Sequence, residues 1–170
     1  MTRIGLISDT HGFLDRRFLK HLRRCDEIWH AGDIGDIAIA DEIAAIKPLR
    51  AVYGNIDGQD IRIVYPEINR FTCEQVDVMI KHIGGYPGNY DRSVISILKD
   101  NPPKLFISGH SHILKVIYDK ISKVLHMNPG AAGKSGLHEV QTMIKFVIDK
   151  EDIKDLEVVE LDRRQRFFRK

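Results

Sequence analysis

The chain contains five hydrophobic runs, and each of them ends in a residue that can bind a metal. These ends supply two carboxylates, one amide and four imidazoles. Ligands of open α/β sheets gather at the carboxyl ends of the strands, so five such ends at one edge would bring these side chains together. The set suits a pair of divalent metals, and paired metals suit the hydrolysis of phosphate esters. In chain order the residues are Asp9, His11, Asp33, Asn55, His82, His110 and His112.

The residue types narrow the choice of metal. Carboxylate oxygens and imidazole nitrogens suit Mn²⁺, Fe²⁺, Zn²⁺ and Ni²⁺, whereas four histidines argue against a magnesium or calcium site. Asp9 and His11 lie two residues apart, as do His110 and His112. In an extended backbone this spacing sends both side chains to the same side of the chain. A carboxylate such as Asp33 can bridge two cations that lie roughly 3.5–4 Å apart.

The first third of the chain alternates between strand-like and helix-like patterns. Short apolar runs closed by polar turns predict strands, and apolar residues at helical spacing between them predict helices. This alternation is typical of parallel βαβ units. The expected elements are strands over residues 3–8, 27–31 and 49–53 and helices over residues 14–24 and 37–46.

The pattern changes after residue 60. Strand-like runs follow one another without a helix, which predicts antiparallel pairing, and a helix over residues 90–100 precedes a β-rich C-terminal part. The whole predicts a single α/β domain over residues 1–170, in which two sheets pack face to face with helices outside. The further expected strands cover residues 61–65, 68–73, 76–83, 105–108, 114–118, 124–127, 140–148 and 153–161.

Composition excludes several classes of protein. Hydrophobic residues make up 43% of the chain and the formal net charge is +2, which fits a globular domain and does not favour nucleic acid as a partner. Cys25 and Cys73 form no CxxC pair, so a cysteine zinc ribbon is excluded and each is expected to be a small buried hydrophobe. Without a recognisable signal peptide or membrane span, the protein is expected to be cytoplasmic. The basic segment 163–170 is expected to be a solvated tail.

The combined motifs resemble the signature of the calcineurin-like metallophosphoesterases. The short chain and the compact Asn128-Pro129-Gly130 segment are more similar to the family's small bacterial and archaeal phosphodiesterase branch. That branch also includes the scaffold subunit of the retromer coat. The matching segments run from residue 4 to residue 130 and are Asp9-x-His11, Gly32-Asp33, Gly54-Asn55-x-Asp57, His82 and Gly109-His110-x-His112.

The resemblance implies a four-layer α/β/β/α sandwich of two mixed sheets and a dinuclear metal site. It implies two divalent transition-metal ions, foremost Mn²⁺ with Fe, Ni or Zn as alternatives, and a hydroxide between them that attacks phosphorus in line. The implied partners are a small phosphate-ester substrate and further copies of the chain. One metal would be held by Asp9, His11, Asp33 and His112, and the other by Asp33, Asn55, His82 and His110.

Two positions depart from the family's pattern. Many members have a histidine after the motif asparagine that protonates the leaving group, whereas this chain has Ile56, which cannot donate a proton. Asp57 is the remaining catalytic candidate, either as a weak acid or as a residue that orients a ligand. Some small members have Gly-His after the strand-end histidine, but Ile83 and Gly84 stand here, so a substrate-contacting imidazole is missing.

For several other residues the sequence allows more than one interpretation. His30 is either a packed strand histidine or a residue that orients a metal ligand. For His126 and His138 the sequence indicates no partner. Tyr86 and Tyr90 are candidates for lining a cleft, although helix packing explains Tyr90 equally well.

Two classes of function compete. The leading hypothesis is a metal-dependent phosphoesterase that acts on phosphodiesters more than on phosphomonoesters. The alternative is a non-catalytic protein–protein scaffold on the same fold, but a scaffold is expected to have lost ligands and this chain keeps all seven. A nuclease ranks lower because the net charge is modest and the length leaves no room for a DNA-binding domain.

Overall fold

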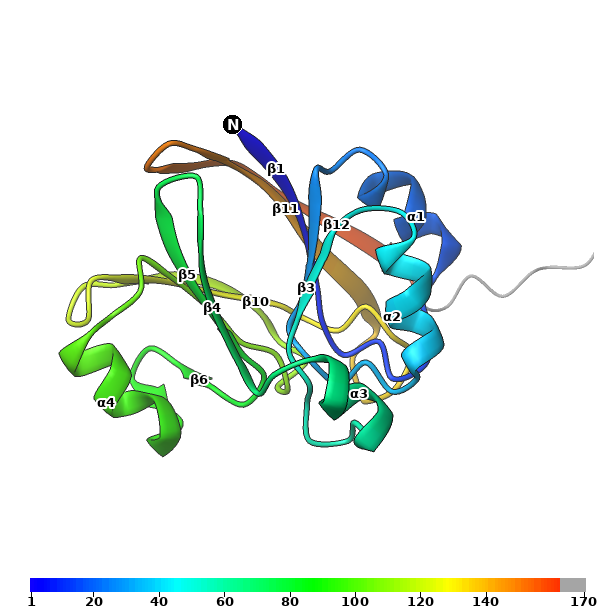
Figure 1. Ribbon diagram of the computed structural model, residues 1–170, viewed down its shortest axis with the longest axis horizontal. Helices are drawn as coiled ribbons and strands as arrows, with labels where there is room; N and C mark the ends of the chain where they lie inside the picture. The colour runs from blue at the N-terminus through cyan, green and yellow to red at the C-terminus, as the bar shows by residue number, and fades with distance from the viewer. Residues whose placement is uncertain (163–170) are drawn as a thin grey trace, which may run out of the picture.

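The structure is a computed structural model that describes residues 1–162, and the predicted solvated tail at 163–170 lies outside the described residues. Two five-stranded sheets form the body of the molecule (Figure 1). In spatial order, the first sheet consists of β12 (Asp152–Asp162), β11 (Val140–Asp149), β1 (Thr2–Ile7), β2 (Glu27–His30) and β3 (Leu49–Ala51). The second sheet consists of β4 (Ile68–Cys73), β5 (Val76–Lys81), β8 (Leu105–Ile107), β10 (Val124–Pro129) and β9 (Leu114–Asp119).

Helices cover the outer faces of both sheets. Helices α1 (Arg16–Leu22) and α2 (Ile37–Ala44) pack on the first sheet, and α4 (Arg92–Asp100) packs on the second (Figure 1). The predicted four-layer α/β/β/α sandwich of mixed sheets is therefore confirmed. Within residues 1–162, none of the helices combines the length and apolar character that crossing a membrane requires. The remaining elements are α3 (Gln59–Val64) and a small hairpin of β6 (Gly85–Tyr86) and β7 (Asn89–Tyr90).

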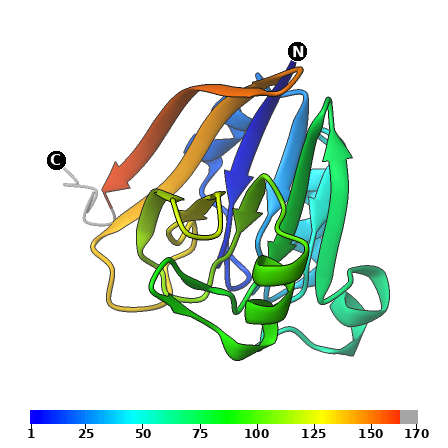
Figure 2. The same cartoon turned by 90° about the vertical axis from the view of Figure 1, so that its left-hand side faces the viewer.

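Each sheet contains three parallel strands, which lie at one side of the first sheet and at the centre of the second. In the first sheet β1, β2 and β3 run parallel, and in the second β5, β8 and β10 do so. Strands β11, β12, β4 and β9 pair antiparallel on the flanks. Figure 2 looks onto the side of α4 and shows the second sheet in front of the first. Parallel neighbours end at a common edge, and this brings their following loops together.

Aromatic side chains pack around Trp29 in the core between the two sheets. This residue is fully buried in β2, and its ring meets those of Phe71 at 5.1 Å and Phe146 at 5.7 Å between centroids, both edge to face. The indole Nε1 donates a hydrogen bond of 2.9 Å to a carboxylate oxygen of Glu27, so its polar end is also satisfied. Trp29 thus joins strands of both sheets.

The strand predicted over residues 61–65 is wrong, because the segment belongs to helix α3. Its apolar residues suggest a strand, yet only Ile61 is buried, while Ile63 and Val64 are 73% and 59% exposed. Pro66 then ends the helix, since the residue before a proline is disfavoured in helical conformation. The other expected elements are confirmed, with ends that differ by at most two residues. The β6–β7 hairpin has no counterpart among the predicted elements.

We expect Trp29→Ala to lower the free energy of unfolding by about 3–5 kcal/mol, because it removes a large buried side chain that contacts both sheets. Chemical denaturation followed by circular dichroism measures this change. Tyr118→Ala is the matched control, since Tyr118 is 57% exposed on β9 and its loss should change stability by less than about 0.5 kcal/mol. Equal effects of the two substitutions would contradict the assignment of Trp29 to the core.

Candidate metal centre

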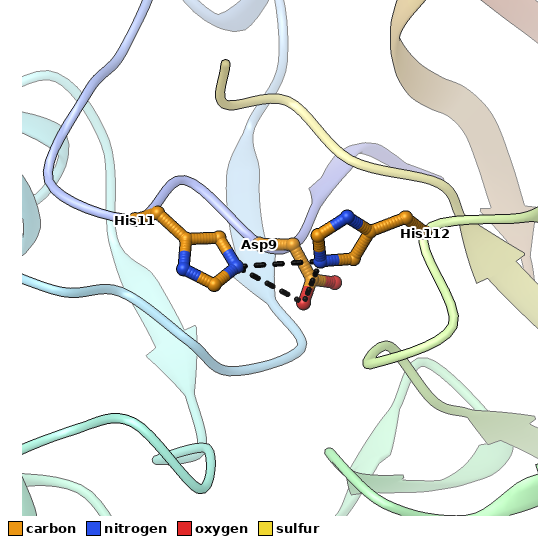
Figure 3. A group of neighbouring side chains, drawn as sticks. All are labelled: Asp9, His11 and His112. Carbon is orange, nitrogen blue, oxygen red and sulfur yellow. Dashed lines mark hydrogen bonds and ion pairs between the residues drawn. The ribbon is translucent and has the colours of Figure 1, made fainter. Parts of the chain in front are cut away.

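Loops that follow β1, β2, β5 and β8 bring six of the predicted ligands into two groups. In each group, one ligand atom from each of three side chains lies within 4.8 Å of the other two. Figure 3 shows the first group, in which both imidazoles point toward the carboxylate. The first group is Asp9, His11 and His112, and the second is Asp33, His82 and His110.

The carboxylate of Asp9 offers a single oxygen to the first group. Its Oδ2 accepts hydrogen bonds from the hydroxyl of Ser8 at 2.6 Å and the backbone N–H of His110 at 3.2 Å. Its Oδ1 lies 3.2 Å from Nε2 of His112 and 3.8 Å from Nε2 of His11. This buried oxygen has no hydrogen-bond partner among residues 1–162. Burial opposes ionisation, but the imidazoles of His11 and His112 outweigh it and hold the pKa of Asp9 well below its ordinary value.

In the second group, His82 presents one ring nitrogen to Asp33. Its Nδ1 lies 2.7 Å from the carbonyl oxygen of Ala31, which can only accept, so Nδ1 carries a hydrogen and donates it. Its Nε2 lies 3.2 Å from Oδ1 of Asp33 and has no hydrogen-bond partner in the described part of the chain. A histidine whose second nitrogen donates to a carbonyl is oriented as metal ligands usually are. The ring of His110 lies 5.4 Å away between centroids.

Asp33 lies between the two groups. Its Oδ1 faces His82, whereas its Oδ2 lies 3.7 Å from Nε2 of His11. The two oxygens of one carboxylate therefore face different groups, an arrangement that suits a bridging ligand. Asn55 lines a cavity of about 290 Å³ together with His82. The next residue, Ile56, donates its backbone N–H to Oδ1 of Asp33 at 3.1 Å.

The backbone conformation of the ligands differs from the predicted one. An extended backbone was the expected reason for the i, i+2 spacing, and this expectation is wrong because five ligands adopt left-handed conformations. Each such residue costs of order 1–3 kcal/mol, so the surrounding loops must hold it in place. Backbone hydrogen bonds from Asp9 to Gly32 at 2.9 Å and from His11 to Asp33 at 3.0 Å do so. The φ values are 54° for Asp9, 47° for His11, 54° for Asp33, 66° for His110 and 58° for His112.

Two glycines allow the loops to approach the carboxylates. A Cβ atom on Gly54 would collide with the side chain and backbone nitrogen of Asp33. A Cβ atom on Gly109 would collide with the hydroxyl of Ser8 and the carboxylate of Asp9. Gly54 and Gly109 are therefore required by this close approach.

Asp57 is buried and its carboxylate accepts three backbone hydrogen bonds. The donors are Ile34 at 3.1 Å and Gly35 at 2.7 Å in the loop after β2, and Gly54 at 2.7 Å in the loop after β3. These contacts tie the loop of Asp33 to the loop of Asn55. They favour the second alternative for Asp57, that of a residue that orients ligands.

His30 also supports the ligand loops. Its Nδ1 accepts the backbone N–H of Gly32 at 3.1 Å, and its Nε2 lies 3.0 Å from the hydroxyl of Thr10. Because that hydroxyl donates to the carbonyl of Ile34, it accepts the hydrogen of His30 Nε2. Burial lowers the pKa of His30 to about 4, so the ring stays neutral in this role. These contacts support the interpretation of His30 as an orienting residue.

Asn128 holds the loop of His110 and His112, a role that sequence reasoning missed. Its side-chain amide donates to the carbonyl of Gly109 at 2.8 Å and to the hydroxyl of Ser111 at 3.1 Å. The only signal in the sequence is the Asn-Pro-Gly segment itself, which does not say which loop it contacts. His138 packs its ring edge-on against His112, at 5.2 Å between centroids.

Comparison with known proteins identifies the family of this chain. A probable metallophosphoesterase from Methanocaldococcus jannaschii is 34% identical over 139 residues, which are 75% of this chain and 67% of that protein. Zinc-complexed wild-type Vps29 from Entamoeba histolytica superposes with a TM-score of 0.72 at 18% identity, covering 94% of this chain and 98% of the other. A novel archaeal phosphodiesterase superposes with a TM-score of 0.63 at 20% identity, covering 92% and 99%. The family model of the calcineurin-like phosphoesterase superfamily domain matches residues 2–151, and the chain therefore belongs to that superfamily.

Proposed function

We propose that this protein is a phosphodiesterase that depends on two divalent transition-metal ions. The main support is the pair of buried ligand atoms, Oδ1 of Asp9 and Nε2 of His82, that lack hydrogen-bond partners within the described residues. A buried polar atom without a partner costs about 1–3 kcal/mol, and a bound cation would offset that cost. The surrounding set of carboxylates and imidazoles suits Mn²⁺ first, with Fe, Ni or Zn as alternatives.

Asp33 would be the ligand that both ions share. This assignment is supported by its two oxygens, which face His82 and His11 separately. When bound, two such ions would supply a nucleophile from water at neutral pH and offset negative charge on the phosphoryl oxygens. The proposed sets are Asp9, His11, Asp33 and His112 for one ion, and Asp33, Asn55, His82 and His110 for the other.

Two cavities beside the second group support a diester substrate. The larger, of about 520 Å³, is lined by His110, and the smaller, of about 290 Å³, is lined by His82 and Asn55. Ile83 lines both cavities. A phosphodiester has an ester arm on each side of its phosphorus, whereas a monoester has one. Two cavities that border the second group therefore favour a diester.

A protein–protein scaffold on the same fold is the second candidate. It is favoured by apolar side chains along the edge strand β9, where Val116, Ile117 and Tyr118 are 39%, 39% and 57% exposed. The same edge suits a further copy of the chain. The retained ligand set favours the enzyme.

Reconstitution with metal should produce hydrolysis of an aryl phosphodiester that is faster than hydrolysis of a phosphomonoester, with a cyclic nucleotide as the third substrate. His112→Ala and Asn55→Ala each remove one ligand. Each should lower kcat/KM by more than the roughly 10–100-fold that loss of an outer-shell partner costs. His21→Ala, on α1 and outside both groups, is the matched control and should retain activity.

Metal content by mass spectrometry completes this experiment, with two ions expected per wild-type chain. Wild-type activity in both ligand variants would refute the assigned site. Failure of the metal-loaded protein to hydrolyse any of the three esters would favour the scaffold.

The leaving group should control the rate, because Ile56 stands where many relatives have a proton donor. We expect turnover of aryl diesters to fall steeply as the pKa of the leaving group rises. Ile56→His should flatten this dependence, since a general acid contributes roughly 10²–10⁴-fold for poor leaving groups. Ile56 is 48% exposed, so the substitution should be tolerated, and Ile56→Asn is the control without a proton donor. A wild-type rate that is insensitive to the leaving group would contradict this prediction.

Asp57→Asn separates the two roles of Asp57. If Asp57 orients the ligand loops, the variant should lose about 1–3 kcal/mol of stability and bind metal more weakly, because an amide cannot accept three backbone hydrogen bonds equally well. The dependence on the leaving group should stay unchanged. Urea denaturation and metal titration measure these effects, with Asp60→Asn in the same segment as control. A steeper dependence on the leaving group at wild-type stability would instead identify Asp57 as the acid.

A further inference from the structure

The larger cavity beside the candidate metal centre has the features of a binding site for an organic group. Its volume of about 520 Å³ lies within the range of small-molecule sites. It is lined by the β6–β7 hairpin and by residues of β10, and Gly109 and His110 at its border connect it to the second group of ligands. A phosphate at the metals would therefore place one of its ester arms here.

The walls of the cavity combine aromatic rings with cations. Tyr86 and Tyr90 both line it, and the hydroxyl of Tyr90 donates to a carboxylate oxygen of Asp119 at 3.0 Å, which holds that ring in place. The ammonium of Lys115 lies 3.7 Å from the centre of the Tyr86 ring, and Arg92 also lines the cavity. Aromatic rings and cations together attract flat, electron-rich rings by stacking and by cation–π contact.

His126 lines the cavity and carries an unused hydrogen-bond acceptor. The hydroxyl of Ser108 donates to the carbonyl of Gly85 at 3.1 Å, so it accepts the hydrogen of His126 Nε2 at 3.0 Å. Nδ1 is then left with a lone pair. This atom is buried without a hydrogen-bond partner in residues 1–162, and the fully buried ring lines the cavity. Burial, with the charge of Lys115 adding to it, lowers the pKa of His126 to about 4, so the ring is neutral and accepts near pH 7.

We infer that this cavity binds one ester arm of the substrate, and that this arm is a planar aromatic group with an N–H or O–H donor, the chemical class to which nucleobases belong. The donor would satisfy His126 while the ring stacks beside Tyr86. The inference rests on the proposed function, because the metal centre is what places the phosphate next to the cavity.

Calorimetric titration of the full-length, Zn²⁺-loaded protein with adenosine tests this without hydrolysis. Adenosine should bind, and Tyr86→Ala should weaken binding about 5- to 100-fold, the range for loss of one base–aromatic contact. Tyr118→Ala is the matched control, because it removes an exposed tyrosine that does not line the cavity. Equal binding by Tyr86→Ala and wild type would overturn the inference.

The acceptor role of His126 is tested on the wild-type protein, so it does not depend on the folding of a variant. Purine riboside lacks the exocyclic amine of adenosine and should bind about three- to tenfold more weakly, as expected for one neutral hydrogen bond. His126→Leu should bind the two nucleosides equally. Equal affinities in the wild type would remove His126 from the inference.

The results of these binding experiments can be distinguished from the test of the proposed function. Hydrolysis of the aryl diester without any binding of adenosine would overturn only this inference. Binding of adenosine without hydrolysis of any ester would overturn the proposed function and support the assigned ligand class. Binding of inorganic phosphate alone, lost in Arg92→Ala and Lys115→Ala, would overturn the inference in favour of an anion site.

Discussion

Two carboxylates, Asp9 and Asp33, lie in the loops that follow β1 and β2, with 0% and 2% of their surfaces exposed. A buried ionised carboxylate costs several kcal/mol unless it is paired and hydrogen-bonded. Asp9 is held by Ser8 and by the loop of His110, and the remaining oxygens face imidazoles. Much of the local structure serves to stabilise these buried charges. Each supporting residue either donates a hydrogen bond or shapes a loop that donates one.

Three further residues, Asp57, His30 and Asn128, act on loops rather than on the carboxylates directly. Asp57 joins the loops after β2 and β3, and His30 joins those after β1 and β2. Asn128 fixes the loop after β8 from the neighbouring strand β10. The left-handed ligands are stable only within this framework, since each alone would favour another conformation. The site therefore has a rigid frame before any ligand binds.

The sequence predicts well that six of the candidate ligands come together, because apolar runs mark strands and their ends are fixed by polar residues and glycines. Where the ligands lie follows from parallel pairing, which the alternation of strands and helices indicates. The segment 61–65 misleads because its apolar residues are exposed on a helix, so local pattern and burial disagree. The extended-backbone argument for Asp9 and His11 fails because tertiary hydrogen bonds, which no spacing encodes, impose left-handed conformations.

The cavity next to His110 is even harder to predict from sequence patterns. It depends on the β6–β7 hairpin, two strands of two residues each, which is too short for a periodic signal. The hydrogen-bonding capacity of His126 in the cavity wall depends on its tautomer. Ser108 and Gly85, which are distant from His126 in the chain, set this tautomer. The buried orphan atoms differ in what would satisfy them: a cation would satisfy Oδ1 of Asp9 and Nε2 of His82, whereas a hydrogen-bond donor would satisfy Nδ1 of neutral His126. Two metal ions and a phosphodiester whose aromatic arm carries a hydrogen-bond donor would together satisfy all three buried atoms. This is a physical reason to consider the metal centre and the cavity as one site.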